Sequence, residues 1–334
     1  MLVGNDHIKI FAGSASKQFA QKMCDYLGSP MGHSTTIHFS EGNTYVRFDE
    51  CIRDMDVYFV QTIGLHSNDE FMELLFYIDA AKRASANSIS VIMPFFSYAK
   101  GDKKDEPRVS IRARVCAECM ELAGADRFVT MDLHAQQIQG FFKRPMDHLY
   151  AQPILTEVIK RVGLENTVVV SPDAGYAKQA RKFATSLNLP VAIGDKNRTD
   201  HSENAEVLEI IGDVKGKNCL IVDDFTISGG TLVDLAKGLK ARGALEINCM
   251  LSHNIISKKG VEKLNASPIK AIYSTDTVYN PNIEGEEKFK TVSVAPMFAE
   301  TIMRYYKHDS INQMFSKLPE HVTEASIELA GLKL

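Results

Sequence analysis

The sequence predicts an α/β fold with two domains, each a mainly parallel sheet flanked by helices. Short apolar runs with the length and branching of buried strands alternate along the chain with stretches whose apolar residues recur at helical spacing. The chain has 334 residues, 45% of them hydrophobic, which is enough for two domains that each bury a core. Polar loops follow several of the strand-like runs, as is typical of the carboxyl edge of a parallel sheet.

The individual elements follow from these patterns. The predicted strands cover residues 8–12, 57–62, 89–94, 128–131, 168–171, 191–193, 219–222 and 247–251. A helix is predicted over residues 69–86, because Phe71, Leu74 and Ile78 share one of its faces and the segment from Ser67 to Glu70 resembles a capping box. We expect this helix to pack rather than to carry chemistry.

The boundary between the two domains is predicted where apolar residues are fewest. The bridge over residues 143–152 contains Pro145 and is followed by Pro153, and both prolines discourage regular structure. The prediction is therefore an N-terminal αβ domain over residues 1–147 and a C-terminal αβ domain over residues 148–317. The tail over residues 318–334 begins near a proline and carries mixed charges, and its role is left open.

Composition limits the classes of function. The formal net charge is −4, with acids and bases interspersed, so the chain lacks the basic stripe that a nucleic-acid binder needs. The sequence shows neither a signal peptide nor an apolar run long enough to span a bilayer, which predicts a cytoplasmic protein. Cys116 and Cys119 have the spacing of metal ligands but lie in a helical pattern without a second pair nearby, which favours ordinary packing.

The most informative segment runs from Cys219 to Gly243. A buried strand ends in Asp223 and Asp224, and a turn made of Ser228, Gly229, Gly230 and Thr231 precedes a helical pattern. Such a turn can direct backbone N–H groups and a helix N-terminus at a phosphate. The two carboxylates can accept hydrogen bonds from the hydroxyls of a pentose and share a bound Mg²⁺. The segment therefore predicts a site for a phosphorylated sugar.

Polar residues also follow three other predicted strands. Asp132 and His134 follow the strand over 128–131, and either residue could bind Mg²⁺ directly or through water. Asp173 follows the strand over 168–171, where it would suit a metal or a ribose, although a helix cap explains it equally well. Lys196 and Arg198 follow the strand over 191–193, where a pair of cations is most often a solvated surface.

These segments resemble one known family. The loop from Asp223 to Thr231 is similar to the phosphoribosyl diphosphate loop of type I phosphoribosyltransferases and of ribose-phosphate pyrophosphokinases. The segment from Asp132 to Phe142, DLHAQQIQGFF, is similar to the signature of the pyrophosphokinases, and simple phosphoribosyltransferases lack it. Further likeness in order and spacing extends from about Ile8 to about Phe315. The chain is therefore identified as resembling the ribose-phosphate pyrophosphokinase family.

The resemblance implies a fold, a reaction and a set of site residues. Both domains would have the phosphoribosyltransferase type I fold, and the enzyme would transfer the diphosphoryl group of ATP to the anomeric hydroxyl of ribose 5-phosphate, giving AMP. Lys196 and Arg198 match the catalytic cations of the family. The implied ribose 5-phosphate site is Asp223, Asp224, Ser228, Gly229, Gly230 and Thr231. The implied ATP contacts are Phe39, Glu41, Asn43, Lys100 and Asp102, and the implied Mg²⁺ ligands are His134, Asp132 and Asp173.

The resemblance also implies a homo-oligomer, a hexamer or at least dimers, in which Phe39 and Glu41 reach the nucleotide of a neighbouring subunit. The sequence departs from the family at Asn43, Lys100, Gly101 and Tyr176. These departures support one alternative, a non-catalytic regulatory homologue. A second alternative is a phosphoribosyltransferase that consumes the diphosphate. Phosphate activation, ADP inhibition and the preferred diphosphoryl donor stay open.

Overall fold

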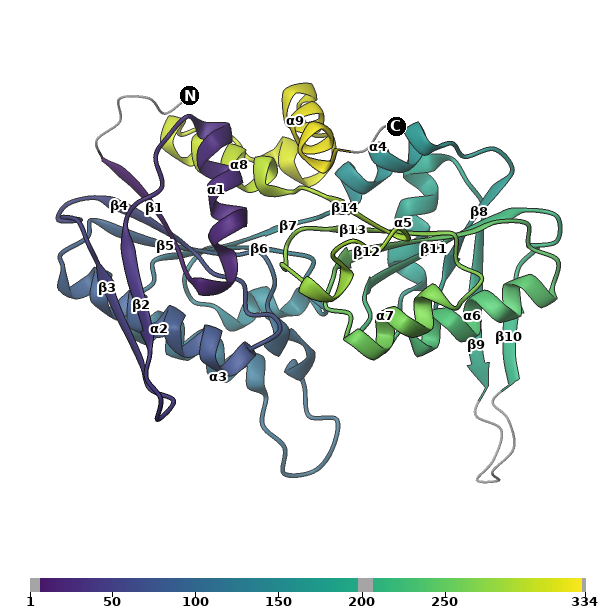
Figure 1. The fold of residues 1–334 in the computed structure, drawn as a ribbon, viewed down its shortest axis with the longest axis horizontal. Coiled ribbons are helices and arrows are strands. Elements are labelled where there is room, and N and C mark those ends of the chain that lie inside the picture. The colour runs from purple at the N-terminus through teal and green to yellow at the C-terminus, as the bar shows by residue number, and fades with distance from the viewer. Residues whose placement is uncertain (1–6, 198–206, 332–334) are drawn as a thin grey trace. The chain divides into compact units, whose positions relative to one another are not determined.

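The computed structural model describes residues 7–197 and 207–331, and the chain divides into two compact units (Figure 1). The first unit runs up to Ala151 and also contains Asp276–Tyr279 and Val294–Ser326. The second unit contains Gln152–Thr275, Asn280–Ser293 and the residues from Ile327 onward. The expectation of one continuous second domain over 148–317 differs from this division, because residues 294–317 group with the first unit.

The first unit is built on a parallel five-stranded sheet with the strand order β1-β4-β5-β6-β7. The strands of this sheet are β1 (Ile8–Ala12), β4 (Asp56–Val60), β5 (Ser88–Met93), β6 (Arg127–Met131) and β7 (Met146–Leu149). An antiparallel hairpin joins β2 (Ser34–His38) to β3 (Thr44–Phe48). The helices of the unit are α1 (Lys17–Leu27), α2 (Ser67–Arg83), α3 (Arg112–Ala123), α8 (Ala295–Lys307) and the first turns of α9 (Glu320–Ala330), and its 3-10 segments are η1 (Ser14–Ser16), η2 (Ser97–Gly101), η3 (Gln136–Phe141) and η5 (Asn312–Phe315).

Helices cover both faces of this sheet (Figure 1). On one face, Val57 and Phe59 of β4 pack in a single core cluster with Leu74 of α2 and Met120 of α3. On the other face, α1 packs against α8, and the rings of Phe19 and Phe298 meet edge to face with their centroids 5.5 Å apart. Alternate residues of a buried parallel strand point to opposite faces, which explains why these strands read as continuous apolar runs.

The second unit contains a seven-stranded sheet with the order β10-β9-β8-β11-β12-β13-β14. Only β10 runs antiparallel to its neighbour. The strands are β8 (Thr167–Ser171), β9 (Val191–Asn197), β10 (Val207–Ile211), β11 (Asn218–Phe225), β12 (Ile247–His253), β13 (Ala271–Thr275) and β14 (Phe289–Val292). The helices are α4 (Gln152–Val162), α5 (Ala177–Leu187), α6 (Gly230–Ala241) and α7 (Lys258–Asn265), and a 3-10 segment η4 (Pro281–Ile283) precedes β14. Figure 1 shows α6 and α7 on one face of the sheet and α4 and α5 on the other.

The predicted α/β fold with parallel sheets is confirmed. Each of the predicted strands is present, with boundaries that shift by a few residues. The prediction that Cys116 is a packing residue also fits the structure, because Cys116 is buried in α3 and burial raises its pKa to about 12. Within the described parts of the chain, no helix is long and apolar enough to cross a membrane.

Two local predictions are wrong. The bridge over 143–152 is not irregular, because β7 forms there as the edge strand of the first sheet, and the carbonyl of Pro145 accepts the N–H of Phe128 at 2.9 Å. A proline is tolerated directly before an edge strand, since its missing N–H falls outside the ladder. The capping box at Ser67 also fails: Ser67 is the first residue of α2, and its hydroxyl donates to the carbonyl of Gly64 at 2.8 Å. Glu70 instead accepts the backbone N–H groups of Gly64 and His66.

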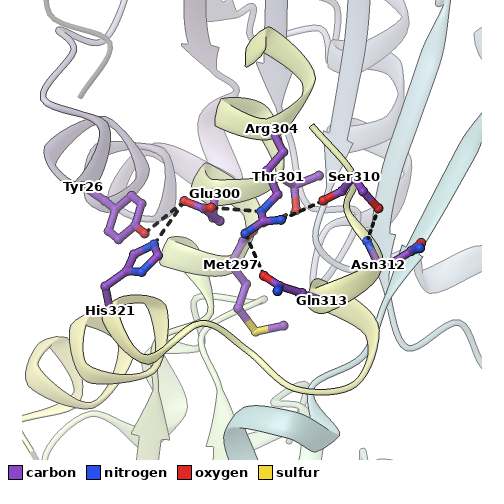
Figure 2. A network of polar contacts seen from close by, with 9 residues as sticks. All are labelled: Tyr26, Met297, Glu300, Thr301, Arg304, Ser310, Asn312, Gln313 and His321. Atoms are coloured by element: carbon purple, nitrogen blue, oxygen red, sulfur yellow. Dashed lines mark hydrogen bonds and ion pairs between the residues drawn. The ribbon is translucent and has the colours of Figure 1, made fainter. Parts of the chain in front are cut away.

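The segment after α8 is attached to the first unit through a polar network (Figure 2). The buried carboxylate of Glu300 accepts the Nε–H of Arg304 at 2.9 Å and the hydroxyl of Tyr26 at 3.3 Å, and Nε2 of His321 lies 3.5 Å from it. Arg304 also donates to the carbonyl of Ser310 at 2.7 Å and to Oε1 of Gln313 at 3.1 Å. Through these contacts Glu300 and Arg304 connect α1, α8, η5 and the start of α9, which gives part of the tail a structural role.

Replacing Glu300 by alanine is expected to destabilise the protein strongly. The Glu300 and Arg304 side chains are only 11% and 15% exposed, so the variant leaves a nearly buried guanidinium without its partner. Removing one member of a buried ion pair costs about 3–5 kcal/mol of unfolding free energy. Urea unfolding measures this cost. Glu328→Ala, at an exposed position of α9, is the control and should change the unfolding free energy by about 0.5 kcal/mol or less. An equal effect of both variants would contradict the structural role of the network.

Candidate functional site

The phosphate loop, defined here as residues 226–229, lies at the carboxyl end of β11 in the middle of the second sheet. Gly229 has φ of +69° and is the N-cap residue of α6, a conformation that glycine adopts without strain. Within the loop, the Gly229 N–H donates to Oγ1 of Thr226 at 3.1 Å. Ser228 and Thr231 are exposed at the helix N-terminus, where N–H groups of the first turn lack partners within the helix. The local geometry is that of an anion site.

Helix α7 supports this loop from one side. The Ser257 N–H donates to the carbonyl of Ile227 at 2.9 Å, and a Cβ atom added to Gly260 would lie 2.6 Å from the same carbonyl oxygen. A Cβ atom at Gly229 would lie 2.9 Å from Cγ of Leu264. The loop therefore rests on α7 without space for an extra methyl group. Sequence reasoning missed Gly260, since no local pattern indicates that this glycine faces the loop.

Three carboxylates gather next to the loop. Asp223 and Asp224 are half-buried at the end of β11, and the N–H of Asp224 donates to Oδ1 of Asp223 at 2.9 Å. Burial raises the pKa of Asp223 well above its ordinary value, and repulsion from Asp224 and Asp173 raises it further. Asp173 follows β8, the neighbour of β11 in the sheet. The structure thus places Asp173 near Asp223, and the negative charge of this group favours cations and hydroxyl donors.

Asp173 also serves the local backbone. Its Oδ1 accepts the N–H of Tyr176 at 2.9 Å, just before α5, and the Ser171 hydroxyl donates to its carbonyl at 2.7 Å. The Asp173 side chain thus fixes the turn before α5, but the N-cap residue of that helix is Tyr176 and not Asp173. A carboxylate has about four lone-pair sites, so one such hydrogen bond leaves room for a second role.

Strand β9 brings the backbone of Lys196 to the same edge of the sheet. Residues Val191 to Ile193 pair in parallel with β8, and the strand continues as an antiparallel hairpin in which Lys196 is opposite Leu208. The expected extended segment is therefore a strand as far as Asn197. Arg198 lies outside the described residues.

In the first unit, Asp132 and His134 follow β6 at a strained turn. Asp132 has φ of +38°, unusual for a residue other than glycine, and its Oδ2 accepts the N–H of Ala151 at 3.0 Å. His134 is exposed on the adjoining segment. Sequence reasoning missed His148, which is 3% exposed: its Nε2 accepts the Leu133 N–H at 2.8 Å and so fixes the peptide between the two predicted ligands.

The predicted ATP residues occupy two segments of the first unit. Phe39, Glu41 and Asn43 are exposed in the turn of the β2–β3 hairpin, where the Phe39 N–H donates to the carbonyl of Asn43 at 2.8 Å. Lys100 lies in η2, and Asp102 follows directly after it. Phe39 is 43% exposed, so its side chain is accessible at the turn of the hairpin. Whether the two segments bind one nucleotide stays a prediction.

A metal site is likewise a prediction. In the ranges that the structure describes, no group of three or more His, Cys, Asp or Glu side chains is arranged to hold a metal ion. Asp132 and His134 belong to the first unit and Asp173 to the second. Their chemistry still suits Mg²⁺, which is commonly held by one or two carboxylates together with substrate phosphates.

The fold and the loop define a class: an α/β protein in which a glycine-containing loop and a helix N-terminus lie at the carboxyl edge of a parallel sheet, the geometry that suits an anion. Residues 8–124 match the family model for the N-terminal domain of ribose phosphate pyrophosphokinase, and residues 201–316 match the model for the phosphoribosyl synthetase-associated domain. The chain belongs to the ribose-phosphate pyrophosphokinase family.

Individual relatives agree with this assignment. The chain is 42% identical to a ribose-phosphate pyrophosphokinase of Chlorobaculum tepidum over 309 residues, which cover 92% of this chain and 95% of the relative. It is 43% identical to the enzyme of Caldanaerobacter subterraneus over 311 residues, 92% of this chain and 98% of that protein. Among solved structures, the phosphoribosylpyrophosphate synthetase of Mycobacterium smegmatis is similar, with a TM-score of 0.86, 35% identity, and coverage of 91% of this chain and all of that one.

Proposed function

We propose that this protein transfers the diphosphoryl group of ATP to the anomeric hydroxyl of ribose 5-phosphate, forming 5-phosphoribosyl 1-diphosphate and AMP. One observation carries the proposal at the level of geometry: two carboxylates near the carboxyl end of β11 closely precede a loop that opens onto the N-terminus of α6. This arrangement supplies an anion site for a phosphate and hydrogen-bond acceptors for hydroxyls on the same short segment. Family membership over most of the chain supports the same reaction.

Ribose 5-phosphate is proposed to bind entirely on this segment. Its phosphate would accept hydrogen bonds from four consecutive residues at the end of the loop and the start of α6: Ser228, Gly229, Gly230 and Thr231. Its ring hydroxyls would donate to Asp223 and Asp224, whose mutual repulsion such donors relieve. The anomeric hydroxyl is then left for attack on ATP.

The tight seat of the loop on α7 leads to a prediction for Gly260→Ala. The added methyl group would meet the Ile227 carbonyl at 2.6 Å, so the loop must shift. A displacement of about 1 Å can cost about a hundredfold in rate, and we expect a rise of tenfold or more in KM for ribose 5-phosphate. Steady-state kinetics and calorimetric binding of ribose 5-phosphate measure it. Lys259→Ala, at the exposed neighbouring position, should leave KM unchanged. An unaltered KM in Gly260→Ala would show that the loop does not hold the sugar phosphate.

The transfer step needs positioning and charge neutralisation more than covalent chemistry. The anomeric oxygen would form a bond to the β-phosphorus of ATP while the bridge between the α- and β-phosphoryl groups breaks and AMP leaves. Lys196 and Arg198 are proposed to neutralise the charge that develops on the oxygens of the transferred phosphorus. Asp132, His134 and Asp173 are the proposed ligands of Mg²⁺, which when bound neutralises charge on the triphosphate.

Further parts of the proposal concern ATP, assembly and location. Phe39, Glu41 and Asn43 would contact the nucleotide from the β2–β3 hairpin, and Lys100 and Asp102 from η2. A homo-oligomer, a hexamer or an assembly of dimers, is proposed on the basis of family membership, as is a cytoplasmic location.

Light scattering of the purified protein tests the proposed oligomer. A monomer with full activity would contradict ATP sites that two subunits share.

The reaction itself is tested by AMP release. Purified protein with ATP and Mg²⁺ should release AMP only when ribose 5-phosphate is added, and chelation of the metal with EDTA should abolish the release. Repeating the assay with and without inorganic phosphate reports on activation. A second assay supplies 5-phosphoribosyl 1-diphosphate and a nucleobase in place of ATP and ribose 5-phosphate. Nucleotide formation in this assay, without AMP release in the first one, would instead indicate a transferase. No reaction in either assay, with ribose 5-phosphate still bound, would indicate a regulatory homologue.

A further inference from the structure

The space next to Gly101 is filled by an arginine from another element. A Cβ atom added to Gly101 would lie 2.6 Å from Nε, 2.9 Å from Cβ and 3.3 Å from Cζ of Arg112, the first residue of α3. The backbone does not itself demand a glycine here, because Gly101 is not among the residues with positive φ. A glycine is required here for lack of space, because a side chain at position 101 would displace the guanidinium of Arg112.

Arg112 is held at this place without a carboxylate partner. The residue is exposed, and no Asp or Glu side chain of the described chain lies within ion-pair distance of it. Arg114, on the same helix, pairs with Glu118 at 2.6 Å and donates to the carbonyl of Phe141 at 2.6 Å, so it is structurally engaged. Burial raises the pKa of Tyr98, and the nearby positive charge of Arg112 opposes that rise. Arg112 is thus an exposed, unpaired cation that packs on η2.

Its neighbour in η2 is also a cation. Lys100 is exposed and directly precedes Gly101, the residue on which the guanidinium of Arg112 packs. A lysine is a point charge, whereas a guanidinium is a planar fork that can bind two phosphate oxygens at once. The pair therefore combines a point charge with bidentate geometry, a combination suited to a polyphosphate.

We propose that Arg112 binds the phosphate chain of ATP together with Lys100, and that Gly101 is small so that the guanidinium can reach it. The inference rests on the proposed function, in which η2 contacts ATP. It adds a phosphate-binding residue that sequence reasoning did not find, because Arg112 is separated from Lys100 along the chain and its packing on Gly101 is what places it against η2.

Binding and kinetics of Arg112→Ala and Arg112→Lys test the proposal. The probe for binding is α,β-methylene ATP with Mg²⁺, titrated calorimetrically, because its bridge cannot be cleaved. We expect Arg112→Ala to weaken binding and to raise KM for ATP by about ten- to hundredfold, with KM for ribose 5-phosphate unchanged. Arg112→Lys should recover only part of the loss. Arg83→Ala removes an exposed guanidinium at the far end of α2 and should change neither constant.

A double-mutant cycle separates binding from a merely structural effect. Gly101→Val should reproduce the loss seen in Arg112→Ala, and adding it to Arg112→Ala should cost little more, because the displaced group is already gone. Unchanged affinity for the analogue in Arg112→Ala, or no binding by the unaltered protein, would overturn the proposal. The two proposals can fail separately. If the unaltered protein binds the analogue but releases no AMP with ATP and ribose 5-phosphate, the proposed function is wrong. The calorimetric titration of the Arg112→Ala variant then still decides whether Arg112 binds the phosphate chain.

Discussion

Replacing Lys196 by alanine is expected to lower kcat for AMP formation by about a hundredfold to a thousandfold, with little change in KM for ribose 5-phosphate. Strand β9 carries the backbone of Lys196 to the sheet edge where the loops after β8 and β11 also lie. In the proposed reaction its charge is needed most when negative charge builds up on the transferred phosphorus, so its removal affects the transition state more than the bound sugar. Steady-state kinetics with both substrates varied separates the two effects.

The control for this variant is Lys270→Ala. Lys270 precedes β13, at the opposite edge of the same sheet, and it is exposed and paired with Glu246 at 2.8 Å. Its removal takes away one positive charge without touching the loops, so kcat should stay the same. Arg198→Ala should follow the pattern of Lys196→Ala. Full turnover in both Lys196→Ala and Arg198→Ala would refute their catalytic role.

Asp223→Asn is expected to stabilise the metal-free, substrate-free protein at neutral pH while it lowers kcat/KM for ribose 5-phosphate by about ten- to hundredfold. Burial and repulsion from Asp224 and Asp173 raise the pKa of Asp223 in the folded state. Ionised Asp223 therefore destabilises the folded protein at pH values above its raised pKa. Below the unfolded pKa of about 3.9, both states are protonated and the penalty is absent. The activity falls because an amide oxygen accepts weaker hydrogen bonds from the sugar hydroxyls.

Thermal unfolding from pH 3.5 to pH 8 measures the stability part of this prediction. Tm of the Asp223→Asn variant should exceed that of the unaltered protein at pH 8, and the difference should vanish toward pH 3.5. Asp213→Asn is a control of opposite sign, since a hydrogen bond from the Lys217 side chain lowers the pKa of that exposed carboxylate. It should leave activity unchanged and should not raise Tm. A lower Tm of Asp223→Asn at pH 8 would contradict the account of the carboxylate group.

The sequence predicted those parts of the fold that short-range pattern determines. Central strands such as β11 are buried on both faces and read as apolar runs, so most were found. The buried strand β13, AIYST, was missed, because its run of apolar residues is interrupted by polar ones. The hairpin strand β2, STTIH, and the edge strand β7, MDHL, have no such run, because one or both of their faces are exposed or covered by polar groups. Helix α8 shows the same limit: its apolar pattern indicates a helix, but long-range contacts such as the packing of Phe298 on Phe19 group it with the first unit.

The candidate site divides in the same way. Asp223, Asp224 and the loop before α6 lie next to one another in sequence, so their chemistry could be inferred from residue types alone. Gly260, His148 and Arg112 act on the loop after β11, on the turn after β6 and on η2 from elsewhere in the chain. These residues matter because of close steric contacts and single hydrogen bonds to distant parts of the chain, and no local sequence pattern indicates such contacts. Asp173 illustrates an intermediate case: the sequence anticipated a metal or ribose contact or a helix cap, and the structure shows a side chain that fixes the turn before α5 and lies near Asp223.

The most direct test of the central claim follows the phosphorus atoms of ATP. The protein is incubated with Mg²⁺ and ribose 5-phosphate, once with ATP labelled at the α-phosphorus and once with ATP labelled at the β-phosphorus, and the products are separated. The account predicts that the α-label appears in AMP and the β-label appears on the sugar, in equal amounts. Recovery of the β-label in ADP would mean transfer of a single phosphoryl group, and it would contradict the proposed diphosphoryl transfer.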